Sequence, residues 1–215
     1  MPQLYRRSVR QSEGIYHVFN RGVNKTLIFL DTADYATYRR FLKEYLQPKE
    51  RTITEILGSK FPMQLKMYHI SKIYSIKNYS ENLQLLSFCL MPNHIHLLVR
   101  QKESGDLAKF IHSLHTRYAM YFNRKHKREG TLFQSKYRSK LVSTDRYLIE
   151  VSKYIHSNPI ALCSKLENYA WSSLAYYHKE TAPEWLHTDL ILSKYIISPV
   201  AKVYKSYSDY VKVRP

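Results

Sequence analysis

Residues 83–100 read LQLLSFCLMPNHIHLLVR, and this stretch indicates the fold class. Its first part, residues 83–90, is a nearly continuous apolar run of the kind that forms a buried strand. Residues 91–93 (MPN) supply turn chemistry, and residues 94–100 (HIHLLVR) are predicted to form a second strand. The two strands are expected to pair as a hairpin, which favours an antiparallel sheet.

Further strands and helices are predicted on both sides of this hairpin. Residues 15–20 (IYHVFN) and residues 133–142 have the composition of strands. Helices are predicted over residues 31–46, 106–126 and 143–157, because each segment begins at a capping residue and repeats apolar positions at helical spacing. The glycine-rich turns of a nucleotide-binding doubly wound sheet are missing from the sequence. The predicted fold class is therefore α+β, an antiparallel sheet with helices packed on one face.

The length and patterning favour one catalytic domain with appended segments. This domain is predicted to span residues 1–180 of the 215-residue chain. Residues 49–82 lack a sustained period, so we expect a surface insertion with one short helix near residues 53–57. Residues 181–215 are expected to form a C-terminal extension that docks on the body or on a partner.

The charge of the chain points to a polyanionic partner. There are 34 Lys and Arg residues against 17 Asp and Glu residues, which gives a formal net charge of +17. Nucleic acid, an anionic membrane surface and a merely solvated basic face all fit this charge. The 20 tyrosines favour nucleic acid, because aromatic rings between cations stack on bases.

Cysteine usage and the N-terminal sequence indicate the compartment. Cys89 and Cys163 are too few for a disulfide framework or a thiolate metal site, so both are read as core thiols. The first residues, MPQLYRRSVRQSEG, lack the apolar core of a signal peptide, and no apolar run approaches the length of a membrane span. We expect a soluble, cytoplasmic protein with no membrane partner.

Two histidines of the second hairpin strand are candidate metal ligands. Successive side chains of a strand point to opposite faces, so His94 and His96 project together, away from the apolar face formed by Ile95 and Leu97. Two imidazoles at this spacing can reach one divalent ion. The alternative is a pair of partly exposed strand histidines without a ligand.

Tyr154 and Asn158 lie four positions apart in the sequence YIHSNP and face the same side of a helix. A residue before proline is pushed out of the helical region, so Asn158 is expected at the frayed helix end with its carboxamide free to bind a metal or a phosphate. Asn158 as a simple cap or turn residue and Tyr154 as one more core aromatic are the alternatives.

An ordered set of motifs resembles the REP-associated tyrosine transposases, which are relatives of single-tyrosine HUH transposases. The resemblance runs from about Tyr16 to Ser173 and leaves residues 49–82 and the C-terminal stretch outside. It is carried by MPNHIHLLV (91–99), YAMYFN (118–123), GTLFQSKYRS (130–139), YIHSNPIA (154–161) and WSS (171–173). The family implies a ferredoxin-like HUH (palm-type) fold.

The resemblance also implies an activity. In similar proteins the histidine pair and a polar residue one turn after the tyrosine bind Mg²⁺ or Mn²⁺, and the tyrosine nicks and rejoins single-stranded DNA through a 5′-phosphotyrosine. Here these positions are His94, His96, Asn158 and the nucleophile Tyr154. Phe133 stands where many relatives carry Trp, and His156-Ser157 replaces their usual pair. Neither change removes a catalytic group.

Substrate binding is assigned to a basic cluster between the two candidate site elements, whose phosphate contacts would give affinity without sequence information. Lys153 is a further candidate, for favouring the phenolate of Tyr154. The expected partner is single-stranded or hairpin DNA, bound by a monomer or a homodimer without a small-molecule cofactor. The predicted DNA-binding residues are Arg124, Lys125, Lys127, Arg128, Lys136, Arg138 and Lys140.

Three alternative hypotheses about the function or the nucleophile fit parts of the sequence. The first is a DNA-binding regulator that kept the fold but no longer cuts. The second places the nucleophile at Tyr118 or Tyr121, which lie beside basic residues, although their spacing fits core packing. The third is another HUH nickase, a plasmid relaxase or a replication initiator, but the size and the single tyrosine motif favour a transposase.

Overall fold

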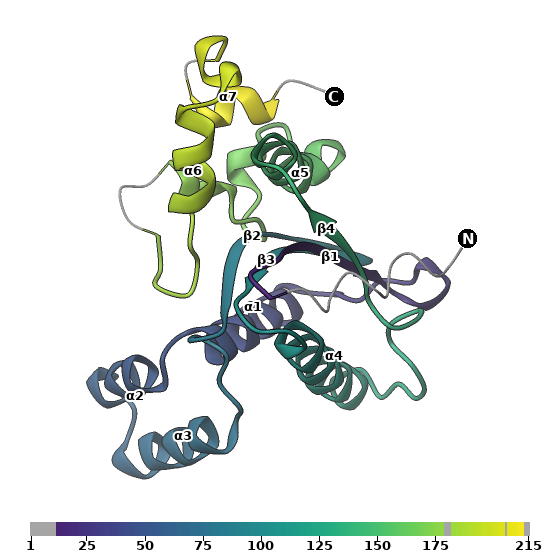
Figure 1. The fold of residues 1–215 in the computed structure, drawn as a ribbon. Coiled ribbons are helices and arrows are strands. Elements are labelled where there is room, and N and C mark those ends of the chain that lie inside the picture. The colour runs from purple at the N-terminus through teal and green to yellow at the C-terminus, as the bar shows by residue number, and fades with distance from the viewer. Residues whose placement is uncertain (1–11, 179–181, 205, 213–215) are drawn as a thin grey trace.

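A four-stranded antiparallel sheet with the strand order β2-β3-β1-β4 organises the protein (Figure 1). The structure is a computed structural model and describes residues 12–178, 182–204 and 206–212. The strands are β1 (Ile15–Arg21), β2 (Leu83–Met91), β3 (His94–Gln101) and β4 (Arg138–Val142). The helices are α1 (Thr32–Leu46), α2 (Lys49–Gly58), α3 (Met63–Ser75), α4 (Asp106–Lys125), α5 (Asp145–Ser157), α6 (Asp189–Ile196) and α7 (Tyr207–Lys212).

The order of the elements confirms the predicted α+β class. Along the chain the sheet is built as β1-α1-β2-β3-α4-β4, and β1 lies between β3 and β4 and runs antiparallel to both. This succession of elements and this strand order define the ferredoxin-like arrangement. The predicted hairpin is the pair β2–β3.

Helices cover both faces of the sheet, so the expectation of helices on one face is wrong. Ile95, Leu97 and Val99 of β3 belong to the core under α1 and α4. Leu98 points the other way, into a second core with α5, α6 and α7. Figure 1 shows α5 and α6 on the side of the sheet away from α1 and α4. The physical reason is β2, whose side chains are apolar on both faces and need cover on both.

Residues 49–82 contain two helices rather than the single short one that was expected. Both α2 and α3 belong to this segment and pack on each other. In α3 only Ile70 and Ile73 are buried, which is too few for a readable helical period. None of the helices in the described ranges is both long and apolar enough to cross a membrane.

The predicted strand 133–142 is a loop over its first half, and β4 begins only at Arg138. Phe133 makes an isolated β-bridge with Gly22, the residue that directly follows β1. At Gly22 a Cβ atom would lie 2.1 Å from the carbonyl oxygen of Thr26, so only glycine lets the chain turn this closely. The loop is thereby fixed beside the end of β1.

Candidate metal and nucleophile site

The strand register brings the two β3 histidines onto the face of the sheet that α5 covers. His94 pairs with Met91 and Arg21, and His96 pairs with Cys89 and Phe19. The rings of His94 and His96 lie perpendicular to each other with centroids 5.0 Å apart. His96 is 5% exposed, whereas His94 is half-buried. One imidazole is therefore deep in the site and the other lies at its opening.

Asn158 caps the C-terminal end of α5 and faces His94. Its backbone is helical, with φ −50° and ψ −44°, so the expectation that Pro159 forces it out of the helical region is wrong. The proline is accommodated because Asn158–Ala161 continues as a 3-10 turn. The Asn158 Nδ2 group donates to the carbonyl oxygen of Tyr154 at 2.8 Å, which leaves Oδ1 3.4 Å from His94 Nε2. The carboxamide oxygen thus points at His94.

Tyr154 projects from α5 over the histidines. Its ring meets those of His96 and His17 edge-on, with centroids 5.4 Å and 5.8 Å away. The side chain is 52% exposed, so it is not a core aromatic. The helix that carries it, α5, is capped at its N-terminus by Thr144, whose hydroxyl accepts from the Tyr147 N–H at 3.1 Å.

The two rival tyrosines have structural partners instead. Tyr118 is fully buried, and its hydroxyl donates to the carbonyl oxygen of Ile28 at 2.5 Å. The Tyr121 hydroxyl donates to Asp34 at 3.2 Å. Both lie on α4, which packs on the sheet face opposite α5. Neither contacts the histidine pair in the described structure.

His17 of β1 is a site residue that sequence reasoning missed. Its Nε2 atom lies 2.9 Å from His96 Nδ1, and the two rings stack with centroids 5.1 Å apart. Burial, with a contribution from the charge of Lys140, lowers the pKa of His17 to about 4. A single histidine in a strand carries no signal by itself, and only the pairing of β1 with β3 brings it here.

The donor set fits a divalent ion. Burial lowers the pKa of both His94 and His96, so both imidazoles are neutral and keep a lone pair for a metal at neutral pH. The Asn158 oxygen adds a third, neutral donor at the same place. Imidazole nitrogen with carboxamide oxygen suits Mn²⁺ and, less well, Mg²⁺, which prefers oxygen ligands.

The predicted DNA-binding residues are spread over three places. Arg138 and Lys140 are exposed on β4 and share a sheet face with His17 and Phe19, their strand partners in register. Lys136 lines a cavity of about 850 Å³ between α4 and the loop before β4. Arg124, Lys127 and Arg128 lie at and after the end of α4, where Arg128 donates to the carbonyl oxygen of Thr131 at 2.8 Å.

Two lysines that the sequence suggested for the site, Lys125 and Lys153, interact with other side chains. Lys125 forms ion pairs with Asp31 and Asp34 at 2.7 Å and 2.8 Å. The ammonium of Lys153 lies 4.4 Å from the centre of the Tyr210 ring in α7. The sequence gives the charge of such residues but not their partners, because all three partners lie far away along the chain.

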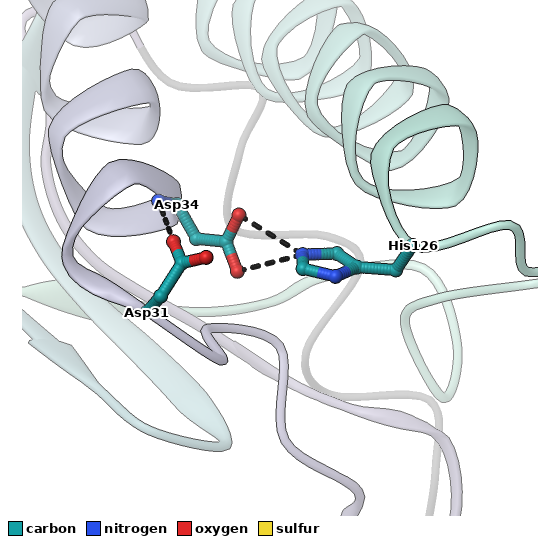
Figure 2. Close-up of side chains that lie close together, drawn as sticks. All are labelled: Asp31, Asp34 and His126. Atoms are coloured by element: carbon teal, nitrogen blue, oxygen red, sulfur yellow. Dashed lines mark hydrogen bonds and ion pairs between the residues drawn. The ribbon is translucent and has the colours of Figure 1, made fainter.

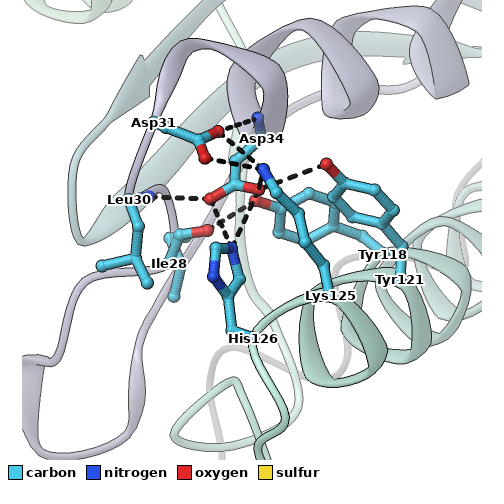
Figure 3. A network of polar contacts seen from close by, with 8 residues as sticks. All are labelled: Ile28, Leu30, Asp31, Asp34, Tyr118, Tyr121, Lys125 and His126. Atoms are coloured by element: carbon cyan, nitrogen blue, oxygen red, sulfur yellow. Dashed lines mark hydrogen bonds and ion pairs between the residues drawn. The ribbon is translucent and has the colours of Figure 1, made fainter.

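A second group of ligand-type side chains joins α1 to the end of α4 (Figure 2). Asp31, Asp34 and His126 bring ligand atoms within 4.8 Å of one another. Figure 3 shows the ammonium of Lys125 among them, and it is bonded to both carboxylates. The lysine supplies the positive charge that a metal would bring, so we read this group as a structural ion-pair network.

We expect Asp34→Asn to destabilise the fold by about 1–3 kcal/mol, because the buried carboxylate also accepts from the Leu30 N–H and from His126. Burial raises the pKa of Asp34, but the bonds from Lys125, Leu30 and His126 outweigh it and lower the pKa overall. The carboxylate therefore stabilises the protein above about pH 4 and loses this effect as the pH falls through the lowered pKa.

Denaturant unfolding at pH 7 and under acid measures this effect, and the difference between wild type and Asp34→Asn should shrink in acid. Asp31→Asn is the matched control, because Asp31 is exposed and shares the same lysine. Equal losses from the two variants would contradict the assignment of Asp34 as the centre of the network.

Buried hydrogen bonds hold α5, and with it Tyr154, in place. The hydroxyl of Tyr207 in α7 lies 2.6 Å from Ser152 Oγ and 2.9 Å from His156 Nδ1. His156 Nε2 lies 2.7 Å from Ser173 Oγ, and this serine in turn accepts from the N–H of Phe88 in β2. The C-terminal segment and the sheet are therefore linked through α5.

Removing the Tyr207 hydroxyl should loosen this link. We expect Tyr207→Phe to cost about 1–3 kcal/mol, because Ser152 and His156 lose a buried partner. Thermal unfolding measures the loss, and Tyr204→Phe is the control, since the described part of the chain gives the Tyr204 hydroxyl no hydrogen bond. An unchanged melting temperature for Tyr207→Phe would contradict a stabilising role for this contact.

The fold and the site together define a ferredoxin-like domain with a histidine pair and a helix-borne tyrosine on one sheet face. The sequence model of the IS200-like transposase family matches residues 63–158. This range contains His94, His96, Tyr154 and Asn158. The match also includes α3, which the motif resemblance leaves outside.

Among solved structures, the chain is similar to a REP-associated tyrosine transposase bound to a REP hairpin. The TM-score is 0.53 at 13% identity, and the match covers 87% of this chain and 93% of that one. No curated protein matches the chain. These findings confirm the resemblance that the motifs indicate, and the family match supports a role as a DNA transposase, a class of enzyme that cleaves DNA.

Proposed function

We propose that the protein nicks and rejoins single-stranded DNA through a covalent bond to Tyr154, with Mg²⁺ or Mn²⁺ held by His94, His96 and Asn158. The observation that carries this proposal is the position of Tyr154. Its half-exposed ring contacts His96, and Asn158 lies one helical turn further along α5 and faces His94. The closeness of the proposed nucleophile to the three proposed metal donors supports the proposal.

The chemistry is a phosphoryl transfer. The phenolic oxygen of Tyr154 attacks the phosphorus, the bond to the 3′ oxygen breaks, the phenolic proton leaves to water and the 3′ oxygen takes up a proton. A divalent ion bound by the three donors would neutralise charge on the phosphate and hold it in line. The same steps in reverse rejoin the strand without ATP, because the covalent bond conserves the energy of the phosphodiester.

The DNA strand is proposed to lie along the basic residues near β4. Arg138 and Lys140 are exposed on the sheet face that carries His17, and they are the strongest members of the predicted set. Each phosphate contact that is removed should reduce the slope of log affinity against log salt by about one. We expect this reduction for Arg138→Gln in salt titrations of hairpin binding, and an unchanged slope would contradict the contact.

The proposed partner is single-stranded or hairpin DNA in the cytoplasm. A net charge of +17 favours such a polyanion, and the similar solved transposase is bound to a hairpin. We propose a monomer as the active form, since all the proposed site residues come from one chain, with a homodimer as the alternative.

The test is incubation of the protein with labelled single-stranded hairpin DNA and Mn²⁺, followed by a denaturing gel. The proposal predicts a labelled protein band that survives denaturation and disappears with a chelator. Binding to several hairpin and unstructured strands without any adduct would instead support a DNA-binding regulator.

A further inference from the structure

The contact between His17 and His96 gives β1 a part in the site that the proposed function does not use. We propose that His17 is a positioning residue that accepts a hydrogen bond from His96 Nδ1 and so presents the Nε2 lone pair of His96 to the metal. This inference rests on the proposed function, because it concerns the same metal site.

The geometry leaves His96 one nitrogen for a ligand. Its Nδ1 atom is 2.9 Å from His17 Nε2, a hydrogen-bond distance. A neutral imidazole has one donor and one acceptor nitrogen, so a proton on Nδ1 leaves the lone pair on Nε2. The opposite arrangement, with the proton on His17 Nε2, places the His96 proton on Nε2 and blocks coordination. Metal binding therefore requires His17 to be the acceptor.

Burial makes this partner necessary. His17 and His96 are 8% and 5% exposed, so water has little access to the contact. Without His17, the His96 Nδ1–H group would be a buried donor without a partner whenever the metal is bound. Histidine ligands generally donate their second N–H to such a partner, and its loss commonly weakens metal binding about 10- to 100-fold.

His17 also contacts both the proposed ligand His96 and the proposed nucleophile Tyr154. Its ring stacks on His96 at 5.1 Å and meets the edge of the Tyr154 ring at 5.8 Å. Phe19, two residues along β1, is near the same histidine at 6.0 Å but offers no hydrogen bond. This difference between two neighbouring aromatic side chains provides a matched control.

The test is the Mn²⁺ dissociation constant of the full chain without DNA, measured by the electron paramagnetic resonance signal of free Mn²⁺. His17→Phe keeps an aromatic ring at this position and removes the nitrogen acceptor. We expect it to bind Mn²⁺ about tenfold more weakly or worse. His17→Gln restores an acceptor oxygen and should stay within about threefold of wild type. Phe19→Leu should do the same, which separates the hydrogen bond from packing.

Any one of three results overturns the inference. One is wild-type Mn²⁺ affinity in His17→Phe. Another is an equal loss in His17→Phe and His17→Gln, which would mean that the imidazole acts in another way, for instance as a direct ligand. A long-range ¹H–¹⁵N spectrum of the metal-free protein reads the tautomer independently, and a proton on His96 Nε2 also contradicts it.

The experiments distinguish a failure of the inference from a failure of the proposed function. If wild type forms the DNA adduct but His17→Phe binds Mn²⁺ normally, only the inference is wrong. If the Mn²⁺ affinities follow the expected order but no adduct forms, only the nicking activity is wrong. Thermal unfolding of each variant shows whether a lower affinity reflects a lost fold.

Discussion

Tyr154→Phe should abolish the covalent DNA adduct completely and leave hairpin binding within about twofold of wild type. Phenylalanine keeps the ring that contacts His17 and His96 and removes only the oxygen that attacks phosphorus. The half-exposed hydroxyl carries no structural hydrogen bond among the described residues, so the fold should be unaffected. A gel assay with Mn²⁺ and a filter-binding assay with chelator measure the two effects.

Tyr147→Phe is the control for this variant. Tyr147 lies two helical turns earlier on α5, and its ring contact with Lys140 at 4.8 Å does not need the hydroxyl. We expect normal adduct formation. An adduct that persists in Tyr154→Phe would move the nucleophile to another tyrosine, and Tyr121 would be tested before Tyr118, because the Tyr118 hydroxyl is buried against Ile28.

His94→Ala should lower the rate of adduct formation at least about a hundredfold, since a catalytic divalent ion contributes several kcal/mol of transition-state stabilisation. His94 is the proposed ligand that faces Asn158, and its removal leaves one imidazole and one carboxamide to hold the ion. Hairpin binding in the presence of chelator should not change, because this binding depends on phosphate contacts. Single-turnover kinetics at increasing Mn²⁺ measure the effect.

Asn158→Asp is the informative counterpart. A carboxylate binds divalent ions more tightly than a carboxamide does, so this variant should need less Mn²⁺ for half-maximal activity. Normal activity of His94→Ala at low Mn²⁺ would contradict the assignment of the metal site. An unchanged Mn²⁺ requirement in Asn158→Asp would remove Asn158 from the set of ligands.

Much of the fold could be predicted because its signals are local. The run 83–100 specifies a hairpin through its apolar strand, its Pro-Asn turn and its alternation, and all three are read within a few residues. The caps Asp31 and Thr144 mark the starts of α1 and α5 correctly. The alternation in β3 also predicts correctly that His94 and His96 share a face.

Several of the remaining errors arise because the structure depends on residues outside the segment that carries the sequence signal. The helices α5, α6 and α7 pack against β2. The apolar side chains of β2 indicate that the strand is buried, but they do not indicate which helices cover it. The helical backbone of Asn158 depends on the turn that follows it, which overrides the local preference before proline. The contact between His17 and His96 joins residues 79 positions apart.

The choice among the tyrosines also needed the structure. By spacing alone, Tyr154 is one of many tyrosines on an amphipathic helix, and Tyr121 is as close to basic residues in the sequence. Packing separates them, because Tyr121 bonds to Asp34 on the far side of the sheet while Tyr154 stands over the histidines. The sequence motif and the packing both favour Tyr154 as the proposed nucleophile.

The proposed mechanism is tested most directly by identifying the residue that becomes joined to DNA. The wild-type adduct formed with hairpin DNA and Mn²⁺ is digested with nuclease and protease, and the modified peptide is sequenced by mass spectrometry. We expect a nucleotide linked through its 5′ phosphate to Tyr154 and to no other tyrosine. A phosphate on any other residue, or a 3′ linkage, would contradict the proposed mechanism.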